Sequence, residues 1–380
     1  MTIVFLSNFF NHHQKFLSDE LYRLTQGNYI FVETGSMPEE QIKLGYPTYV
    51  EPYVVHYDSE SKSRIDRNIF YADVVIMGEA PLVLVKRRIR AGRLTFRDDE
   101  RRYKSIFKYL KWPIYTINSL TLNKCYLLCA SAFAPRDYSL SGMKLSKCYR
   151  WGYFPEVKTY SDIDMLINNK YSNVSGKVKL LWACRMIDWK HPELAVFLAY
   201  RLKQRDIGFD LDMVGRGDME LKLSVMIDRL NLNDCVHMLG PMSPYELRDH
   251  MEKADIFLMT SDKYEGWGVT LNEAMNSACA VVASHAIGSV PFLIHNNKNG
   301  AIYHSCNVDE LFDKTLYLIN NKEARIRMSE NAYKTIVTDW NPRRAAENLI
   351  YLVDSLLNGQ TNPIKHGPCS HAERLTDNWI

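Results

Sequence analysis

The chain lacks several features that define common protein classes. Its eight cysteines include no C-x2-C pair, so we expect reduced thiols rather than a zinc motif or a disulfide framework. No G-x-G-x-x-G follows the first apolar run, which argues against a nicotinamide-dependent dehydrogenase. No apolar run approaches the ~20 residues that span a bilayer, and the N-terminus has no charged signal region. We therefore expect a cytoplasmic protein in a reducing compartment.

The chain also has little net charge, but that charge is unevenly distributed. The sum over 380 residues is only +3. The segment from Glu79 to Lys111 holds eleven basic and four acidic residues, a net +7, which leaves −4 for the rest. Basic and aromatic residues over 86–111 suit an anionic membrane surface or a phosphorylated acceptor, and a solvated helix face is the alternative. No nucleic-acid-binding motif accompanies them, so no nucleic-acid partner is expected.

Short apolar runs alternate with amphipathic segments in two successive series. The first predicts strands at 2–7, 29–33, 73–77, 94–96, 114–117 and 126–130, with helices at 14–24, 82–91 and 101–110. The second predicts strands at 179–183, 209–214, 236–239, 255–260 and 280–284, with helices at 192–202, 220–230, 244–253 and 270–277. Such alternation favours parallel pairing, so the sequence predicts an α/β fold of two doubly wound, Rossmann-like domains facing a central cleft.

The composition also suggests where these domains begin and end. We place the first domain at 1–155, a polar linker at 156–177 and the second domain at 178–338. A crossover helix is expected within 339–357, and residues 358–380 form a polar tail that we expect to be loosely held.

The most informative segment runs from Thr260 to Met275 and reads TSDKYEGWGVTLNEAM. Its two glycines let backbone amides approach an anion, and the helix that follows adds the positive end of its dipole. Glu265 and Glu273 flank this anion site, where carboxylates suit the hydroxyls of a ribose or sugar. The pattern indicates a site for a sugar joined to a nucleotide through phosphates. The alternative is a surface loop acid and a helix-dipole contact.

This segment resembles the E-x7-E motif of retaining glycosyltransferases of family 4. Members have the GT-B fold, in which a C-terminal helix crosses back to the first of two Rossmann-like domains. LLWACRMIDWKHP at 180–192 resembles the family's G-R-x4-K segment, with Cys184 and His191 where glycine is usual. VGRG at 214–217, VHMLG at 236–240 and AIGSVP at 286–291 resemble further family turns. The resemblance covers roughly residues 178–355 and is weak before them.

The resemblance implies a donor site in the second domain. Arg185 and Lys190 would grip the donor diphosphate, Glu265 the transferred sugar and Glu273 the ribose. The other donor-binding positions are Gly215, Met238, Gly266, Trp267, Gly268, Val269 and Thr270. Two fixed cations stabilise a leaving diphosphate, so we expect neither a metal nor another cofactor. The D-x-D pairs at 162–164 and 210–212 carry the alternative of a metal-dependent transferase.

The first domain would then bind the acceptor. His12 and His13 follow the first strand, where they suit contact with the acceptor or a phosphate; an exposed or packed histidine is the alternative for each. FRDDER at 96–101 follows the strand at 94–96. We assign Asp98 and Glu100 to catalysis, and Asp99 and Arg97 to contacts on the acceptor side. A solvated helix-capping cluster is the alternative for this segment.

These residues predict a metal-independent, retaining, hexosyltransferase-type glycosyltransferase. It would move a sugar from a nucleotide-diphosphate-sugar to a hydroxyl of a saccharide or lipid-linked saccharide in surface polysaccharide assembly. It would act in the cytoplasm, with peripheral binding to the inner face of the membrane. Two alternatives remain: a nucleotide-sugar 2-epimerase on the same fold, and a non-catalytic protein that binds saccharides or nucleotide-sugars.

Overall fold

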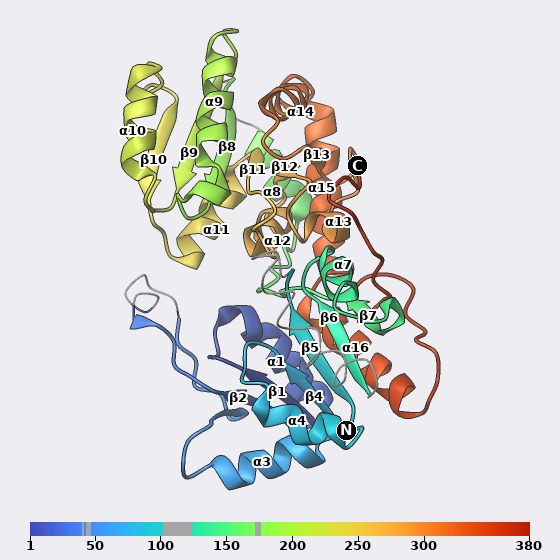
Figure 1. Ribbon diagram of the computed structural model, residues 1–380. Coiled ribbons are helices and arrows are strands. Elements are labelled where there is room, and N and C mark those ends of the chain that lie inside the picture. The colour runs from blue at the N-terminus through green and yellow to red at the C-terminus, as the bar shows by residue number, and fades with distance from the viewer. Residues whose placement is uncertain (40–41, 43–46, 102–123, 172–175) are drawn as a thin grey trace. The chain divides into compact units, whose positions relative to one another are not determined.

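The computed structural model describes residues 1–39, 42, 47–101, 124–171 and 176–380 (Figure 1). The chain divides into two compact units. Unit 1 contains Met1–Glu156 and Asp339–Ile380, and unit 2 contains Val157–Thr338. The helix expected over 101–110, apart from its first residue, and the strand expected over 114–117 lie outside the described residues.

The described residues of unit 1 form a seven-stranded sheet in the order β3-β2-β1-β4-β5-β6-β7, in which all neighbours are parallel. Its strands are β1 (Ile3–Ser7), β2 (Tyr29–Glu33), β3 (Val54–His56), β4 (Val74–Met77), β5 (Thr95–Asp99), β6 (Cys125–Cys129) and β7 (Cys148–Arg150). Every residue of β1 and β4 is buried, as expected for strands covered on both faces. The strand order reverses between β1 and β4, which confirms the predicted doubly wound sheet.

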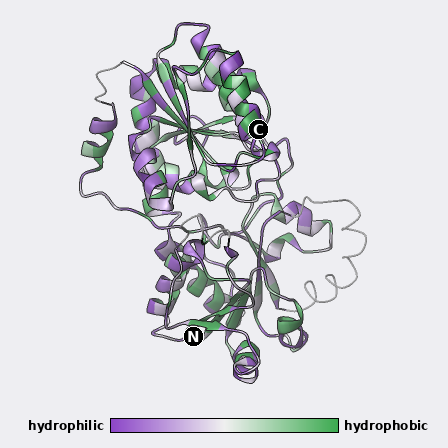
Figure 2. Cartoon of the chain, turned by 90° about the vertical axis from the view of Figure 1, so that its left-hand side faces the viewer, coloured by the Kyte–Doolittle hydropathy of each residue, from purple (hydrophilic) through white to green (hydrophobic). Residues whose placement is uncertain are grey.

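The described helices of unit 1 are α1 (His12–Leu24), α3 (Lys62–Tyr71), α4 (Val83–Arg90), α7 (Ala134–Ser139) and α16 (Pro342–Leu357). Asn11 caps α1, because its side chain accepts a hydrogen bond from the backbone N–H of His13 at 2.8 Å. The helix α16 packs against α1, so the C-terminal helix returns to the first unit as predicted. Figure 2 shows hydrophilic and hydrophobic residues in the same helices, which is typical of helices that lie on a sheet.

The C-terminal segment of unit 1 is packed, so the expectation of a loosely held tail is wrong. Residues 366–377, which we call the C-terminal strap, run beside the edge strand β7. The backbone N–H of Cys369 donates to the carbonyl of Arg150 at 2.7 Å, and His371 forms an antiparallel bridge with Tyr149. Cys369 is fully buried. The polar composition concealed this packing because backbone groups, which every residue carries, make these contacts.

Unit 2 contains a six-stranded sheet in the order β10-β9-β8-β11-β12-β13, and its neighbours are again parallel. Its strands are β8 (Val178–Ala183), β9 (Phe209–Val214), β10 (Val236–Gly240), β11 (Ile256–Met259), β12 (Ala280–Ser284) and β13 (Ala301–Tyr303). Its described helices are α8 (Ile163–Tyr171), α9 (Pro192–Lys203), α10 (Glu220–Arg229), α11 (Pro244–Lys253), α12 (Val269–Asn276), α13 (Val290–Leu293), α14 (Val308–Asn320) and α15 (Lys322–Thr338). The second predicted doubly wound sheet is therefore confirmed.

The helix α8 lies within the segment that we expected to be a polar linker. Its residues Ile167 and Tyr171 are buried in a small cluster with Ala278. The ammonium of Lys170 is also buried and donates to the backbone carbonyls of Ser277 and Ala278, each at 2.8 Å. This segment therefore contributes to the packing of unit 2. Among the described residues, no helix is both long and apolar enough to cross a membrane.

Candidate functional site

Two loops of unit 2 meet at the carboxyl ends of β8 and β11. These strands are neighbours at the point where the strand order reverses, and such points are where open α/β sheets bind ligands. The hydroxyl of Thr260, after β11, donates to the carbonyl of Lys190, after β8, at 2.7 Å. The backbone N–H of Asp262 donates to the carbonyl of Trp189 at 3.0 Å. Both loops that the sequence assigned to the donor therefore lie side by side.

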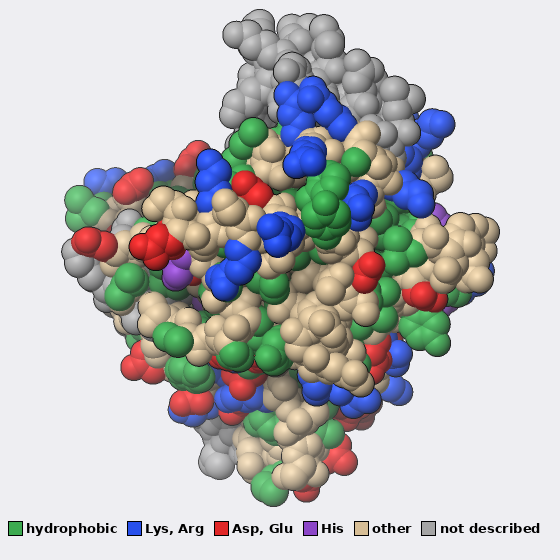
Figure 3. All heavy atoms as spheres, turned by 90° about the horizontal axis from the view of Figure 1, so that it is seen from below, with side chains coloured by type: hydrophobic (Ala, Val, Ile, Leu, Met, Phe, Trp, Pro, Cys, Tyr) green, Lys and Arg blue, Asp and Glu red, His purple; other side chains and the backbone are tan. Residues whose placement is uncertain are grey.

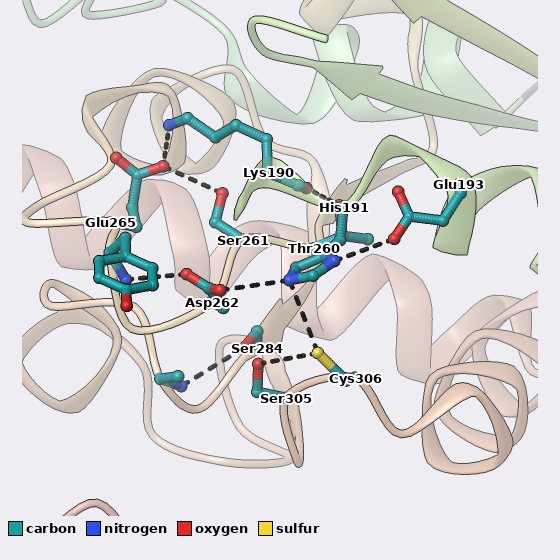
Figure 4. Close-up of polar contacts among 12 residues, drawn as sticks. Lys190, His191, Glu193, Thr260, Ser261, Asp262, Glu265, Ser284, Ser305 and Cys306 are labelled. Carbon is teal, nitrogen blue, oxygen red and sulfur yellow. Dashed lines mark hydrogen bonds and ion pairs between the residues drawn. The ribbon is translucent and has the colours of Figure 1, made fainter. Parts of the chain in front are cut away.

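A buried ion pair joins these two loops (Figure 4). The ammonium of Lys190 contacts one carboxylate oxygen of Glu265, and each side chain is only 9% exposed. The same oxygen of Glu265 accepts a hydrogen bond from the hydroxyl of Ser261 at 3.0 Å. Two of the predicted catalytic residues are thus in direct contact, although 75 positions separate them in the sequence.

Trp189 places two cations beside each other. The ammonium of Lys190 lies 4.4 Å from the centroid of its ring, and the guanidinium carbon of Arg185 lies 5.7 Å from it. Burial opposes the charged form of Lys190, but the neighbouring Cys184 and Glu265 outweigh this effect, so the pKa of Lys190 is raised. Lys190 is therefore a permanent cation near neutral pH. The sequence analysis did not single out Trp189, which supports both predicted diphosphate ligands.

The E-x7-E loop turns sharply into α12 at Gly268. This residue has a φ of +82°, and an added Cβ would lie 2.3 Å from Cε of Met259. The left-handed conformation therefore favours glycine here, and any side chain would also have to displace the end of Met259. Val269 and Thr270, which follow, form the N-terminal turn of α12, where a helix attracts anions. Gly266 is buried, and Trp267 is buried with its indole N–H donating to Asn272 at 2.9 Å. Trp267 thus packs beneath the loop.

Glu273, the second acid of the motif, lies within α12. Burial raises the pKa of its carboxyl, while the positive charge of Arg248 opposes that shift. Arg248, on α11, donates to the backbone carbonyl of Glu273 at 2.8 Å and to the hydroxyl of Ser277 at 3.2 Å. The sequence analysis missed Arg248, because nothing in its local sequence indicates this contact.

The turn after β9 holds the loop after β8 in place. Gly215 has a φ of +134°, and an added Cβ would lie 1.9 Å from the carbonyl oxygen of Cys184. Its own N–H donates to the carbonyl of Gly240 at the end of β10, at 2.8 Å. Met238, in β10, packs partly buried against the core of unit 2. Gly215 therefore lies directly against the chain that leads to Arg185, whereas Met238 lies on the neighbouring strand.

His191 occupies a position where glycine is common in the similar family. Its φ is +48°, a left-handed conformation that glycine adopts more easily. Three polar side chains surround the imidazole: Glu193 at 2.9 Å, Asp262 at 3.3 Å and the thiol of Cys306 at 3.6 Å (Figure 4). The hydrogen bond with Glu193, followed by the interaction with Asp262, raises the pKa of His191 despite its burial. These contacts hold the left-handed turn between Lys190 and α9.

Aspartates of both D-x-D pairs contact other protein groups. In β9, Asp210 pairs with Lys177 at 2.8 Å, and Asp212 lies 3.9 Å from a nitrogen of His250. Asp162 accepts a hydrogen bond from the backbone N–H of Met165 at the start of α8. Within the described ranges, no group of three His, Cys, Asp or Glu side chains is placed to hold a metal ion.

In unit 1, β5 extends to Asp99, so the expectation that this strand ends at Phe96 is wrong. Arg97 donates from Nε to Asp99 at 2.8 Å, and the hydroxyl of Tyr138 also contacts Asp99. These contacts compensate the charge of Asp99 and allow acidic residues to remain in a strand. Arg97 and Asp99 therefore pair with each other, and the helix that they would cap in the alternative lies outside the described residues.

The acids on either side of Asp99 contact aromatic residues that follow β7. Burial raises the pKa of Asp98 well above its usual value, and the charges of Asp99 and Glu100 add to this, whereas a hydrogen bond from Trp151 opposes it. Glu100 accepts a hydrogen bond from the hydroxyl of Tyr153 at 2.8 Å. The sequence analysis missed Tyr153 because it did not predict the strand β7 that precedes this residue.

His12 and His13 lie at the start of α1 with their ring centroids 3.8 Å apart. Burial lowers the pKa of His12 to about 4. Burial and the neighbouring His12 lower the pKa of His13 to about 3. Both imidazoles are therefore neutral near pH 7, and neither adds positive charge for a phosphate. The ring of His13 also stacks on that of Tyr153, with centroids 5.8 Å apart.

Not all of the basic segment faces solvent. Arg88 is only 1% exposed, and its guanidinium donates to the backbone carbonyls of Ile69, Ala72 and Leu94 at 2.7–2.9 Å. It therefore fastens α4 to the end of α3, and the expectation that it belongs to a binding surface is wrong. Arg101 is also buried. Residues 102–111 lie outside the described part of the chain.

Comparison with known protein sequences points to the same region. Residues 166–335 match the family model described as "Glycosyl transferases group 1". A poly(ribitol-phosphate) alpha-N-acetylglucosaminyltransferase of Staphylococcus aureus is 26% identical over 172 residues, which cover 45% of this chain and 34% of that protein. The amylovoran biosynthesis glycosyltransferase AmsK of Erwinia amylovora is 28% identical over 184 residues, which cover 47% and 45%. The chain thus spans less than half the length of these relatives.

Comparison with solved structures extends over both units. Alr3699/HepE of Anabaena in complex with UDP is similar with a TM-score of 0.70 and 14% identity, over 93% of this chain and 100% of that one. The lipopolysaccharide outer core galactosyltransferase WaaB is similar with a TM-score of 0.68 and 14% identity, over 94% and 99%. At this identity the likeness shows the fold, and the predicted GT-B architecture of two Rossmann-like domains is confirmed.

Proposed function

We propose that the protein is a glycosyltransferase that moves a sugar from a nucleotide-diphosphate-sugar to a hydroxyl of a saccharide or lipid-linked saccharide. The observation that carries this proposal is the buried Lys190–Glu265 pair beside the N-terminal turn of α12. It lies at the reversal of the strand order, within the residues that match the glycosyltransferase family. The names of the relatives from Staphylococcus and Erwinia support a role in surface polysaccharide assembly.

The donor would bind with its diphosphate at Arg185, Lys190 and the first turn of α12. Fixed cations and helix N–H groups together compensate the charge of a diphosphate and stabilise it further as it departs. Glu265, held by Lys190 and Ser261, would accept hydrogen bonds from the transferred sugar. Glu273 would accept those of the ribose. Because two cations already serve the diphosphate, the proposal includes no metal or other cofactor.

The reaction would retain the configuration of the sugar. The bond between its anomeric carbon and the diphosphate oxygen breaks, and the acceptor oxygen bonds to the same face of that carbon. The departing phosphate takes the proton of the acceptor hydroxyl, so the protein supplies position and charge rather than a strong base.

A donor panel tests the proposal. UDP-, GDP-, ADP- and dTDP-sugars would each be added to the protein, and the melting temperature and the release of nucleoside diphosphate measured. At 100 times Kd, a bound donor adds about 2.7 kcal/mol of stability. Glu273→Ala should weaken that donor roughly tenfold or more, the loss expected for a hydrogen bond to a charged group. Glu220→Ala, which changes a partly exposed acid at the start of α10, is the matched control.

The outcomes separate the alternatives. If no nucleotide-sugar raises the melting temperature or releases its diphosphate, the transferase proposal is wrong. If a nucleotide-sugar alone is converted to its 2-epimer, the chain is an epimerase. If a donor binds tightly but neither reaction occurs with any acceptor, the protein is a binding protein.

We also propose that unit 1 binds an anionic membrane surface from the cytoplasm through α3 and α4. The guanidinium carbon of Arg87 lies 4.5 Å from the ring centroid of Phe70, and that of Arg93 lies 4.8 Å from it. Tyr71 and Val83 are 63% and 72% exposed. Lys and Arg side chains gather among hydrophobic ones on the face that Figure 3 shows. Such a mixture suits anionic headgroups and the acyl boundary below them.

A further inference from the structure

Side chains from three strand ends of unit 1 meet in one cluster. Tyr153 follows β7, Glu100 follows β5 and His13 lies in the first turn of α1, the helix after β1. The hydroxyl of Tyr153 donates to Glu100 at 2.8 Å, and its ring stacks on His13 at 5.8 Å with an angle of 11° between the planes. The carboxyl ends of parallel strands share one edge of a sheet, and that edge is where ligands bind. The position of the cluster is therefore that of a binding site.

The three successive acids Asp98, Asp99 and Glu100 differ in their surroundings. Asp99 is held by Arg97 and Tyr138. Asp98 has a raised pKa because it is buried beside two other carboxyls. Glu100 accepts a hydrogen bond from the hydroxyl of Tyr153, and this contact fixes the position of its carboxylate. A carboxylate placed in this way is suited to accept a hydrogen bond from a hydroxyl group.

His13 offers a second polar contact. Its lowered pKa keeps the imidazole neutral, so its two ring nitrogens provide one donor and one acceptor. The Nδ1 atom of His13 is buried and has no hydrogen-bond partner among the described residues. Buried polar atoms are nearly always paired in native proteins, so an unpaired one requires an explanation. A bound hydroxyl would supply that partner.

We propose that Tyr153 is a positioning residue that holds Glu100 and His13 as the binding site for the acceptor hydroxyl. The proposal rests on the proposed transferase function and deepens it. The acceptor group bound here is an uncharged, hydroxyl-bearing ring, because a carboxylate and a neutral imidazole both form hydrogen bonds with hydroxyls. The carboxylate repels a phosphate, and the neutral imidazole has no charge that attracts one. Any phosphate of the acceptor lies away from this cluster.

Two substitutions separate the contacts of Tyr153. Tyr153→Phe removes the hydrogen bond to Glu100 and keeps a ring to stack on His13, whereas Tyr153→Leu removes both. Tyr57→Phe is the matched control, because the hydroxyl of Tyr57 donates to Asp66 at 3.0 Å elsewhere on unit 1. Transfer is measured from the donor found in the panel to n-octyl β-D-glucoside and related octyl glycosides.

We expect Tyr153→Phe to raise the KM for the octyl glycoside about tenfold, the loss expected for one hydrogen bond to a charged group. Tyr153→Leu should raise it further, and Tyr57→Phe should leave it at the parent value. The thermal shift caused by the donor should be the same in all four proteins, because donor contacts lie in unit 2. A merely structural role would lower kcat or stability without this selective change in KM.

Three results would overturn the inference. In the first, both Tyr153 variants keep the parent KM for the octyl glycoside. In the second, they lose the donor's thermal shift together with transfer, which would mean a general loss of structure. In the third, the parent releases nucleoside diphosphate but no octyl glycoside increases the rate. If the parent binds no donor at all, the transferase proposal itself fails, which is a distinguishable outcome.

Discussion

The Lys190–Glu265 pair should couple stability to function in a way that a mutant cycle can measure. Both side chains are 9% exposed, and Ser261 is the further polar group bonded to the shared oxygen of Glu265. Removing one member of a buried ion pair leaves an uncompensated charge and costs about 3–5 kcal/mol. Replacing both members with neutral groups is often close to neutral. The double variant should therefore be more stable than either single variant.

The variants are Lys190→Met, Glu265→Gln and the two combined. In a chain segment of the size of unit 2, a loss of about 3–5 kcal/mol lowers the melting temperature by roughly 6–20 °C. Unfolding in urea, followed by tryptophan fluorescence, gives the free energy of unfolding for each protein. We expect both single variants to lose stability and the double variant to recover most of it. All three should bind the donor more weakly than the parent.

A surface pair provides the control for this cycle. Lys177 and Asp210 lie 2.8 Å apart, but their side chains are 43% and 32% exposed. An exposed pair contributes only about 0–1 kcal/mol, so Lys177→Met should cost little. The reasoning is refuted if the double variant is no more stable than the more stable of the two single variants. It is also refuted if Lys177→Met costs as much as Lys190→Met.

Two further predictions concern unit 1. His12 and His13 have pKa values of about 4 and about 3 in the folded chain against 6.5 ordinarily, so below pH 6.5 the unfolded chain binds more protons. Stability should therefore fall from pH 6.5 towards 4, by up to about 1.4 kcal/mol per pH unit for each histidine. His13→Asn should flatten this slope in urea unfolding; an unchanged slope would contradict the burial argument. Separately, the double variant Arg87→Gln, Arg90→Gln should bind phosphatidylserine vesicles roughly thirtyfold more weakly in a sedimentation assay, because each lost charge contributes about 1 kcal/mol of binding free energy. Arg343→Gln is the control: this residue lies on α16, its side chain is 72% exposed, and its substitution should leave vesicle binding unchanged. If the parent, the double variant and the control bind vesicles equally, α4 does not bind the membrane and its basic residues form a solvated face.

The sequence predicted the bounds of some strands in both sheets correctly. The strand at 29–33 is mostly apolar, and the strand at 209–214 begins with apolar and acidic residues in alternation, so both have patterns typical of strands. The end of β5 was missed because Asp98 and Asp99 are unfavourable in a strand by propensity. Their partners come from distant segments: Tyr138 for Asp99 and Trp151 for Asp98. The residues next to Asp98 and Asp99 in the sequence therefore do not indicate that these acids can be accommodated in a strand.

The same distinction applies to the candidate site. The E-x7-E loop and the segment with Arg185 could be found from the sequence, because glycines, charges and their spacing are local signals. The contact between Lys190 and Glu265 could not, because it depends on β8 and β11 being neighbours. Arg88 illustrates the opposite error. Its charge suggested a surface, but its donors satisfy the backbone carbonyls at the end of α3 and the start of β5.

Unit 1 is assembled from both the first and the last stretch of the described chain, and this has a consequence for biogenesis. During translation, all of unit 2 leaves the ribosome before α16 and the C-terminal strap have been made. Unit 2 can then close its sheet from continuous chain. Meanwhile α1 lacks its partner α16, and the edge of β7 lacks the strap. Exposed apolar surface and an unpaired strand edge invite chaperone binding and misassembly. The unit that begins synthesis first is thus the last to mature.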